Sequence, residues 1–264
     1  MNSSRWMCVA KTDVGTVRKV NEDNYLDCCS AGLWCVADGM GGHARGDVAS
    51  QLIIEGLSKL IDASKSESKS PLNLQQISEC IQSVNSVLIQ LSKRHDSIVG
   101  STVAILFIQG AKVYCIWAGD SRIYRLRDRY IFRMTRDHSQ VEDMVDAGLI
   151  SASEAEHHPK ANIITRAVGA HEELKLEIAS FDLDDDDRFL VCSDGLNKVM
   201  SDQELESFIL EHPFADAADA LIDIANKRNA RDNVTAILVQ NETFDETLLN
   251  NTLPLDSTLP LGPR

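Results

Sequence analysis

The succession of strand-like segments limits this chain to few architectures. Ten short runs rich in Val, Ile and aromatic residues follow one another closely and are bounded by Gly or Asp. Antiparallel neighbours need only a short turn, whereas parallel neighbours need a crossover of about a dozen residues or more. We therefore expect antiparallel sheets. The predicted strands lie near residues 5–11, 24–29, 33–38, 102–109, 111–118, 121–126, 130–134, 174–180, 188–193 and 233–240.

Helical segments interrupt these strands. Apolar residues spaced by three and four predict a helix over about 74–93, and a second helix is expected over about 46–61. Two more fit near 201–211 and 214–228. The segment 139–170 carries only short helical pieces, and we expect it to form a protruding flap.

Composition and charge exclude several classes of protein. The chain has 264 residues, 44% of them hydrophobic, which suits one large domain or two small ones. The net charge of −14 argues against nucleic acid and anionic membranes as partners, because phosphate groups attract clustered Lys and Arg. No apolar stretch approaches the roughly 20 residues of a membrane span, and no secretion signal is visible. We expect a cytoplasmic protein.

The cysteines support this location. There are seven, an odd number, without a C-x-x-C motif, and most lie in apolar strand-like runs. This pattern does not favour a disulfide framework or a zinc site. It predicts buried free thiols in a reducing compartment.

Acidic residues recur at the ends of the predicted strands. Any one of them beside Gly is consistent with an ordinary turn. If the strand ends converge, two such charges 4 Å apart repel by about 4 kcal/mol at an effective dielectric of 20, so a cation is needed among them. The acids concerned are Glu22, Asp23, Asp38, Asp120, Asp194 and Asp232.

The ligand type selects the cation. No His or Cys accompanies these acids at ligand spacing, and all-oxygen sites suit Mg²⁺ or Mn²⁺. Two ions about 3.5–4 Å apart would activate a water for attack on a phosphate ester. Arg18, four residues before Glu22, is placed to contact two phosphate oxygens, although in isolation it also fits an ordinary surface residue.

Taken together, the motifs resemble the PP2C-type (PPM family) metal-dependent Ser/Thr protein phosphatases in their bacterial form. The similarity extends over about residues 5–240, in the family's order. The matching stretches are TDVGTVRKVNEDNY (12–25), VADGMGGHARGDVAS (36–50), GSTVAIL (100–106), AGDSRIYRL (118–126), MTRDHSQVEDMVDAGLI (134–150), HPKANIITRAVG (158–169), LVCSDGL (190–196) and RDNVTAILV (231–239).

The resemblance implies an α+β fold, a four-layer α-β-β-α sandwich. Two antiparallel central sheets would face each other, with helices on both outer faces and a helical flap at about 139–170. It also implies a single phosphatase domain over 1–240. The polar segment 241–264 is expected to be a disordered tail, with a docking role for its repeated Thr-Leu-Pro-Leu as the alternative.

The resemblance also implies a set of metal ligands. Asp38 would bridge two Mn²⁺ or Mg²⁺ ions, and the carbonyl of Gly39 would bind the second. Asp194 and Asp232 would bind the first ion. Asp120, together with Asp194, would hold a possible third ion.

Further roles follow from the same resemblance. Glu22 and Asp23 would act through water, Asn233 would support Asp232, and Arg18 would bind the substrate phosphate. Phosphoserine and phosphothreonine in proteins would be hydrolysed in one step by a water that the two ions activate, without a phosphoenzyme.

The proton donor and the flap lie outside this set of ligands. Met40 stands where eukaryotic relatives often carry a catalytic His, and His43 is a weak substitute. Loss of a general acid typically costs about 10²–10⁴-fold in rate, so it need not abolish activity. In the flap, His158 and Arg166 are candidates for contacts with a phosphopeptide, with packing inside the flap as the alternative.

The predicted function is a monomeric phosphatase that acts on phosphoproteins and counteracts a Ser/Thr protein kinase. One alternative is a non-catalytic scaffold that docks through the tail, and the complete set of acids counts against it. A phosphatase for an anti-sigma antagonist ranks lower, because such chains usually lack parts of the VRKVNED segment and the long flap.

Overall fold

Two antiparallel sheets form the centre of the computed structural model, which describes residues 6–41, 45–65, 71–155 and 158–242. The first sheet has the strand order β1-β11-β10-β7-β8. Its strands are β1 (Trp6–Asp13), β11 (Val234–Asn241), β10 (Arg188–Cys192), β7 (Arg122–Arg127) and β8 (Tyr130–Arg133). The second has the order β2-β3-β5-β6-β9, with β4 beside β3. These strands are β2 (Asp23–Cys28), β3 (Leu33–Gly41), β4 (Val99–Ser101), β5 (Val103–Gln109), β6 (Lys112–Ala118) and β9 (Glu177–Asp182).

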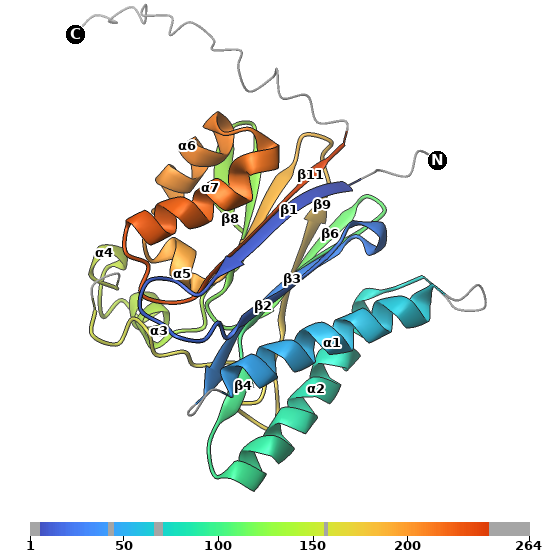
Figure 1. The fold of residues 1–264 in the computed structure, drawn as a ribbon, viewed down its shortest axis with the longest axis vertical. Coiled ribbons are helices and arrows are strands. Elements are labelled where there is room, and N and C mark those ends of the chain that lie inside the picture. Colours follow the sequence, from blue (N-terminus) through green and yellow to red (C-terminus); the bar gives the residue numbers. More distant parts are fainter. Residues whose placement is uncertain (1–5, 42–44, 66–70, 156–157, 243–264) are drawn as a thin grey trace, which may run out of the picture.

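Helices cover both outer faces of this pair of sheets (Figure 1). Helices α1 (Gly46–Ser64) and α2 (Leu74–His95) pack on the second sheet, and α6 (Asp202–Glu211) and α7 (Phe214–Lys227) pack on the first. The predicted four-layer α-β-β-α sandwich is confirmed.

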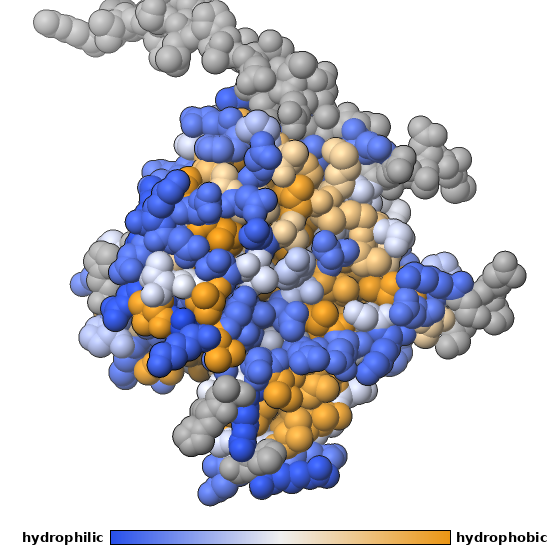
Figure 2. Space-filling model, in the orientation of Figure 1, coloured by the Kyte–Doolittle hydropathy of each residue, from blue (hydrophilic) through white to orange (hydrophobic). Residues whose placement is uncertain are grey.

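Outward-facing side chains of α6 and α7 are mostly hydrophilic (Figure 2). No helix among the described residues is long and apolar enough to cross a membrane.

The layers follow from the alternation of side chains along each strand. In β3, Leu33 and Cys35 face the core beneath α1 and α2, whereas Trp34 and Val36 face the other sheet. All four side chains are fully buried. Because β3 is apolar on both faces, it lies between a helix layer and a second sheet, which is why its sequence is a continuous apolar run.

Shorter elements complete the structure. The flap contains α3 (Gln140–Asp146) and α4 (Ala152–Ala155), as its short helical pieces predicted. The sequence analysis missed β4, the single turn η1 (Cys29–Ala31) and α5 (Asp194–Asn197). β4 and η1 have three residues each and α5 has four, and none of the three shows a clear periodic pattern.

One acidic run differs from its expected role. The sequence Asp184-Asp185-Asp186-Asp187 suggests a solvated turn, yet the Asp187 side chain is fully buried. Its carboxylate accepts hydrogen bonds from Nε of Arg127 at 2.7 Å and Nη2 at 2.6 Å. The expectation was therefore wrong for Asp187, which anchors the β9–β10 turn to β7.

This ion pair yields a test of the fold. Replacing Arg127 with Ala leaves a buried carboxylate without its partner, so we expect the free energy of unfolding to fall by about 3 kcal/mol. Urea denaturation measures the change. Lys112→Ala, which breaks an exposed ion pair with Asp182 at 2.7 Å, is the control and should change stability little. Equal stability of the two variants would contradict the anchoring role.

Candidate metal centre

The predicted carboxylates gather at one end of the sandwich. Asp23 and Asp38 lie directly opposite each other in the β2–β3 register. Asp194 begins α5 immediately after β10, and Asp120 follows β6. Burial raises the pKa of Asp38 well above its usual range, and the nearby charges of Asp23, Asp194, Asp120 and Asp232 raise it further. The strand ends therefore deliver these acids to a common region.

Three of these carboxyl groups are almost completely buried. Asp23, Asp120 and Asp194 are 5–6% exposed. Burial raises the pKa of Asp23 to about 7, against the hydrogen bonds that it accepts. Burial, followed by the charge of Asp194, raises the pKa of Asp120 to about 8. The protein thus confines negative charge in a place where it is poorly solvated.

Each of these three groups also has a buried oxygen without a hydrogen-bond partner, the Oδ1 atom. The Oδ2 atom of Asp23 accepts hydrogen bonds from Ser193 and Thr235, each at 2.7 Å. Leaving a buried carboxylate oxygen unpaired is costly, and a divalent cation would satisfy it.

The donor chemistry therefore fits Mn²⁺ or Mg²⁺, although the side chains do not close on a common point. Among the described residues, no three His, Cys, Asp or Glu side chains form a ready-made set of ligands. Two of the acids instead contact basic residues, Asp232 with Arg18 and Asp194 with Lys198. The unpaired buried oxygens still favour a divalent cation, because these residues offer nothing but oxygen ligands.

The glycines after Asp38 are explained by close packing of the backbone. A Cβ atom on Gly39 would lie 2.0 Å from the carbonyl oxygen of Gly46 and 2.6 Å from that of Glu22. The Gly39 amide donates to the Glu22 carbonyl at 3.1 Å. The Glu22 side chain in turn accepts from the amide of Gly46 at 3.0 Å, at the start of α1. Glu22 therefore joins β3 to α1 in addition to its predicted role near the ions.

Asn233 organises the loop that carries Arg18. Its Nδ2 donates to the carbonyl oxygens of Val14 at 2.9 Å and Val20 at 3.0 Å. Its Oδ1 accepts from the amide of Glu22 at 2.8 Å. Its backbone amide donates to Asp232 Oδ1 at 3.0 Å. Only its backbone amide contacts Asp232, and its side chain holds the loop in place.

Arg18 lies at the rim of the carboxylate cluster. Its Nε and Nη2 each approach one oxygen of Asp232 at 2.9 Å, a bidentate arrangement. About half of its side chain is exposed. The guanidinium is thus held beside the predicted metal ligands by one of them.

The two flap candidates make contacts outside the carboxylate cluster. The ring of His158 accepts a hydrogen bond from the amide of Lys160 at 3.2 Å, a local turn contact. Arg166 pairs with Glu177 at 3.2 Å and approaches His138 Nε2 at 3.0 Å. His138 Nδ1 accepts from the amide of Gly119, beside Asp120. Within the part of the chain that the structure describes, Arg166 is therefore linked to the cluster through His138. His43 lies outside the described residues.

Sequence reasoning missed several residues that support the site. Ser193 and Thr235 hold Asp23, and Thr102 Oγ1 accepts from the amide of Asp38 at 3.0 Å. Lys198 contacts Asp194. The available signals were weak: Ser193 directly precedes Asp194, and Lys198 follows it at helical spacing. Hydroxyl residues inside apolar strands give no sign of their partners.

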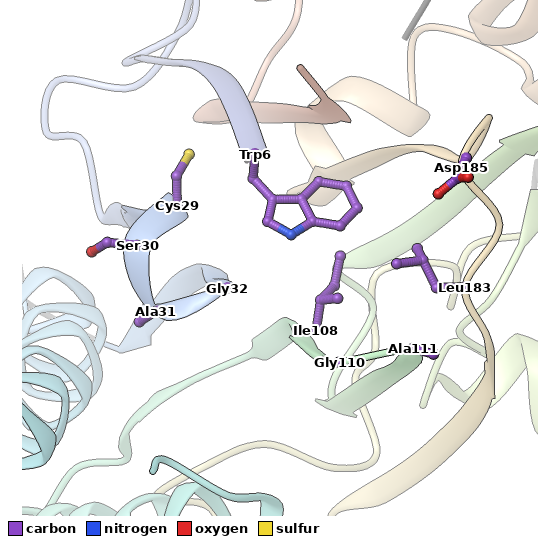
Figure 3. Close-up of a pocket in the computed structure, with 10 residues that line it drawn as sticks. All are labelled: Trp6, Cys29, Ser30, Ala31, Gly32, Ile108, Gly110, Ala111, Leu183 and Asp185. Atoms are coloured by element: carbon purple, nitrogen blue, oxygen red, sulfur yellow. The ribbon is translucent and has the colours of Figure 1, made fainter. Parts of the chain in front are cut away.

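Two cavities among the described residues lie away from the carboxylate cluster. One of about 460 Å³ is bordered by Trp6, Cys29, Ile108 and Leu183, whose positions Figure 3 shows. It lies near the β2–β3 turn, at the opposite ends of these strands from Asp23 and Asp38. A second lies beside Arg166 and Ile178. Neither of these two cavities is lined by the carboxylates of the predicted centre.

Comparison with known proteins relates the chain to one family of enzymes. The sequence profile of the family described as protein phosphatase 2C matches residues 16–239. The chain is 34% identical over 238 residues to the serine/threonine protein phosphatase PstP of Mycobacterium tuberculosis, covering 89% of this chain and 45% of PstP. The chain thus spans about half the length of that curated relative.

Solved structures show the same fold. PppA, described as a key regulatory component of T6SS in Pseudomonas aeruginosa, is 40% identical with a TM-score of 0.79, covering 90% of this chain and 98% of PppA. The catalytic domain of PstP in complex with two manganese ions is 32% identical with a TM-score of 0.79, covering 89% and 97% of the respective chains.

The raised pKa values predict how stability depends on pH. Between about pH 4 and pH 8 the folded chain binds more protons than the unfolded chain, since the carboxyl pKa values are raised on folding. In EDTA, the free energy of unfolding should therefore fall by a few kcal/mol as pH rises through this window. Urea titrations from pH 5 to pH 8 measure the slope. Asp120→Asn should flatten it and Asp182→Asn, an exposed control, should not. A stability that rises over this range would contradict the prediction.

The close packing at Gly39 predicts a second effect. Gly39→Ala places a methyl group against two backbone carbonyls, so we expect loss of the β3–α1 junction and at least about tenfold weaker Mn²⁺ binding, since ligand-supporting shells are worth 10–100-fold. Titration calorimetry measures this affinity. Gly110→Ala is the matched control, because its φ of +61° is strained but nothing lies within 4 Å of the new methyl group. Equal Mn²⁺ affinity in both variants would contradict the role of this contact.

Proposed function

The chain belongs to the protein phosphatase 2C family, and we propose that it is a metal-dependent phosphatase that removes phosphate from phosphoserine and phosphothreonine in proteins. The observation that carries this proposal is the group of buried carboxylates with unpaired oxygens at one end of the sandwich. Such a group suits divalent cations better than any other ligand.

The proposed centre contains two ions, as in the PstP structure with two manganese ions. Asp38 and the Gly39 carbonyl would contribute from β3, Asp194 from the start of α5, and Asp232 from the residues before β11. Bound there, Mn²⁺ or Mg²⁺ would supply Lewis acidity and an activated water for attack on phosphorus. Asp23 and Glu22 would act around the ions through water.

The chain's own hydrogen bonds would orient these ligands. Ser193 and Thr235 fix one oxygen of Asp23 and leave the other free. Thr102 fixes the backbone of Asp38 from both sides, donating its amide to the Asp38 carbonyl at 2.8 Å and accepting from the Asp38 amide. Such support keeps the carboxylates in position before a substrate arrives.

We propose that Arg18 binds the substrate phosphate. A guanidinium has five N–H donors, and the contacts with Asp232 leave some of them available. Because Asp232 holds Arg18 at the rim of the centre, a phosphate oxygen could bind to a guanidinium that is already oriented. His158 and Arg166 remain candidates for contacts with the polypeptide around the phosphate.

The substrates are proposed to be phosphoproteins, and the opposing enzyme a Ser/Thr protein kinase. We further propose that residues 1–240 form the phosphatase domain, that the protein is monomeric and that it acts in the cytoplasm. The tail with its two Thr-Leu-Pro-Leu sequences lies outside the described residues. A non-catalytic scaffold would have no need for buried acids with unpaired oxygens.

The experiment is hydrolysis of a phosphothreonine peptide by the full chain with Mn²⁺. EDTA should abolish the reaction and excess Mn²⁺ should restore it. Asp38→Asn should lower kcat/KM by at least about 10²-fold, because it removes a charge at the reacting centre. Asp182→Asn, an exposed carboxylate at the end of β9, is the control. Undiminished turnover by Asp38→Asn would exclude the proposed centre.

A further inference from the structure

Lys198 lies at the edge of the carboxylate cluster, with 36% of its side chain exposed, and the sequence analysis assigned it no role. It follows directly after α5, whose first residue is Asp194. The Lys198 amide donates to the Asp194 carbonyl at 2.9 Å, and the Nζ ammonium contacts Asp194 Oδ2. One turn of helix therefore directs a positive charge back onto a predicted metal ligand.

The two oxygens of the Asp194 carboxylate differ in their surroundings. Oδ2 is bound by Lys198, whereas Oδ1 is buried and has no hydrogen-bond partner. One oxygen thus remains for an ion of the two-ion centre. The other oxygen, Oδ2, would otherwise be available to hold a third ion together with Asp120, but it is already occupied by an ammonium group.

Asp120 is also within the electrostatic range of Lys198. Burial is the main cause of the raised pKa of Asp120, and the charge of Lys198 opposes it. Burial lowers the pKa of Lys198, but the charges of Asp194, Asp120 and Asp232, with the Asp194 hydrogen bond, raise it above its ordinary value. Lys198 therefore places its ammonium group in contact with Asp194 and within the electrostatic field of Asp120, the two acids expected to hold a third ion.

We propose that the Lys198 ammonium takes the place of the third divalent ion at Asp120 and Asp194, so that this chain carries a two-ion centre with a built-in cation beside it. The inference rests on the proposed function only in treating these acids as metal-binding. A fixed positive charge blocks Asp194 Oδ2 and repels an incoming divalent cation. It also offsets part of the repulsion between the two carboxylates when only two ions are bound.

The experiment counts bound Mn²⁺ by equilibrium dialysis and metal analysis of the full chain. The wild type should bind two ions, and Lys198→Met should bind an additional ion at Mn²⁺ concentrations at least about tenfold below those at which the wild type does. Lys198→Arg keeps the charge and should behave like the wild type. Lys198→Met with Asp120→Asn should lose the additional ion, which places it at Asp120.

The outcomes are distinct. A third ion on the wild type that Asp120→Asn removes, with the same affinity in Lys198→Met, would overturn the proposal. So would an Asp120-dependent third ion in Lys198→Arg but not in Lys198→Met. Circular dichroism would reveal whether Lys198→Met fails to fold. In that case the number of Mn²⁺ ions bound by the wild type still tests the proposal. Ion counting does not depend on turnover, so absence of phosphatase activity would contradict the proposed function without deciding the role of Lys198.

Discussion

The mutual repulsion of buried carboxylates is the constraint on which this end of the molecule depends. Asp23, Asp120 and Asp194 are almost completely shielded from water, and Asp38 lies among them. The fold tolerates this charge by three means. Hydroxyl groups of Ser193 and Thr235 donate hydrogen bonds to Asp23. Basic side chains contact Asp232 and Asp194. Protonation of carboxyl groups with raised pKa values, such as Asp23 and Asp120, lowers the remaining repulsion. A centre of this kind favours the binding of divalent cations by the folded chain.

The sandwich makes such a concentration of charge possible because its acids come from separate elements. Large apolar cores on both sides of each sheet stabilise the strands independently of the site. Each strand can then end in a destabilising residue at the same rim. The Gly39–Gly46 contact shows how tightly the rim is built, since neither position has space for a Cβ atom. The glycines therefore serve the packing of β3 against α1, besides leaving a carbonyl for a ligand.

Much of the fold could be predicted from sequence because its signals are local. Ten strands and four long helices are visible as periodic runs, and Asp38 and Asp194 are recognisable where apolar runs end. The missed features depend on contacts between distant segments. Asp187 belongs to an acidic run that looks solvated, and only the position of Arg127 on β7 makes it a buried ion pair. Nothing in the sequence distinguishes Lys198 from other lysines, and the helical turn of α5 brings its ammonium group to Asp194. The flap residue Arg166 likewise reaches Glu177 and His138 instead of the acids.

Protons released when metal binds provide the most direct test of the central claim that these carboxylates repel one another until a cation joins them. Titration calorimetry of Mn²⁺ into the full chain at pH 7, in two buffers of different ionisation enthalpy, measures how many protons are released per chain. Because the pKa values of Asp23 and Asp120 are raised to about 7 and about 8, and that of Asp38 is also raised, we expect net proton release per chain. Binding of Mn²⁺ without any proton release would show that the acids are already ionised, and would contradict the claim.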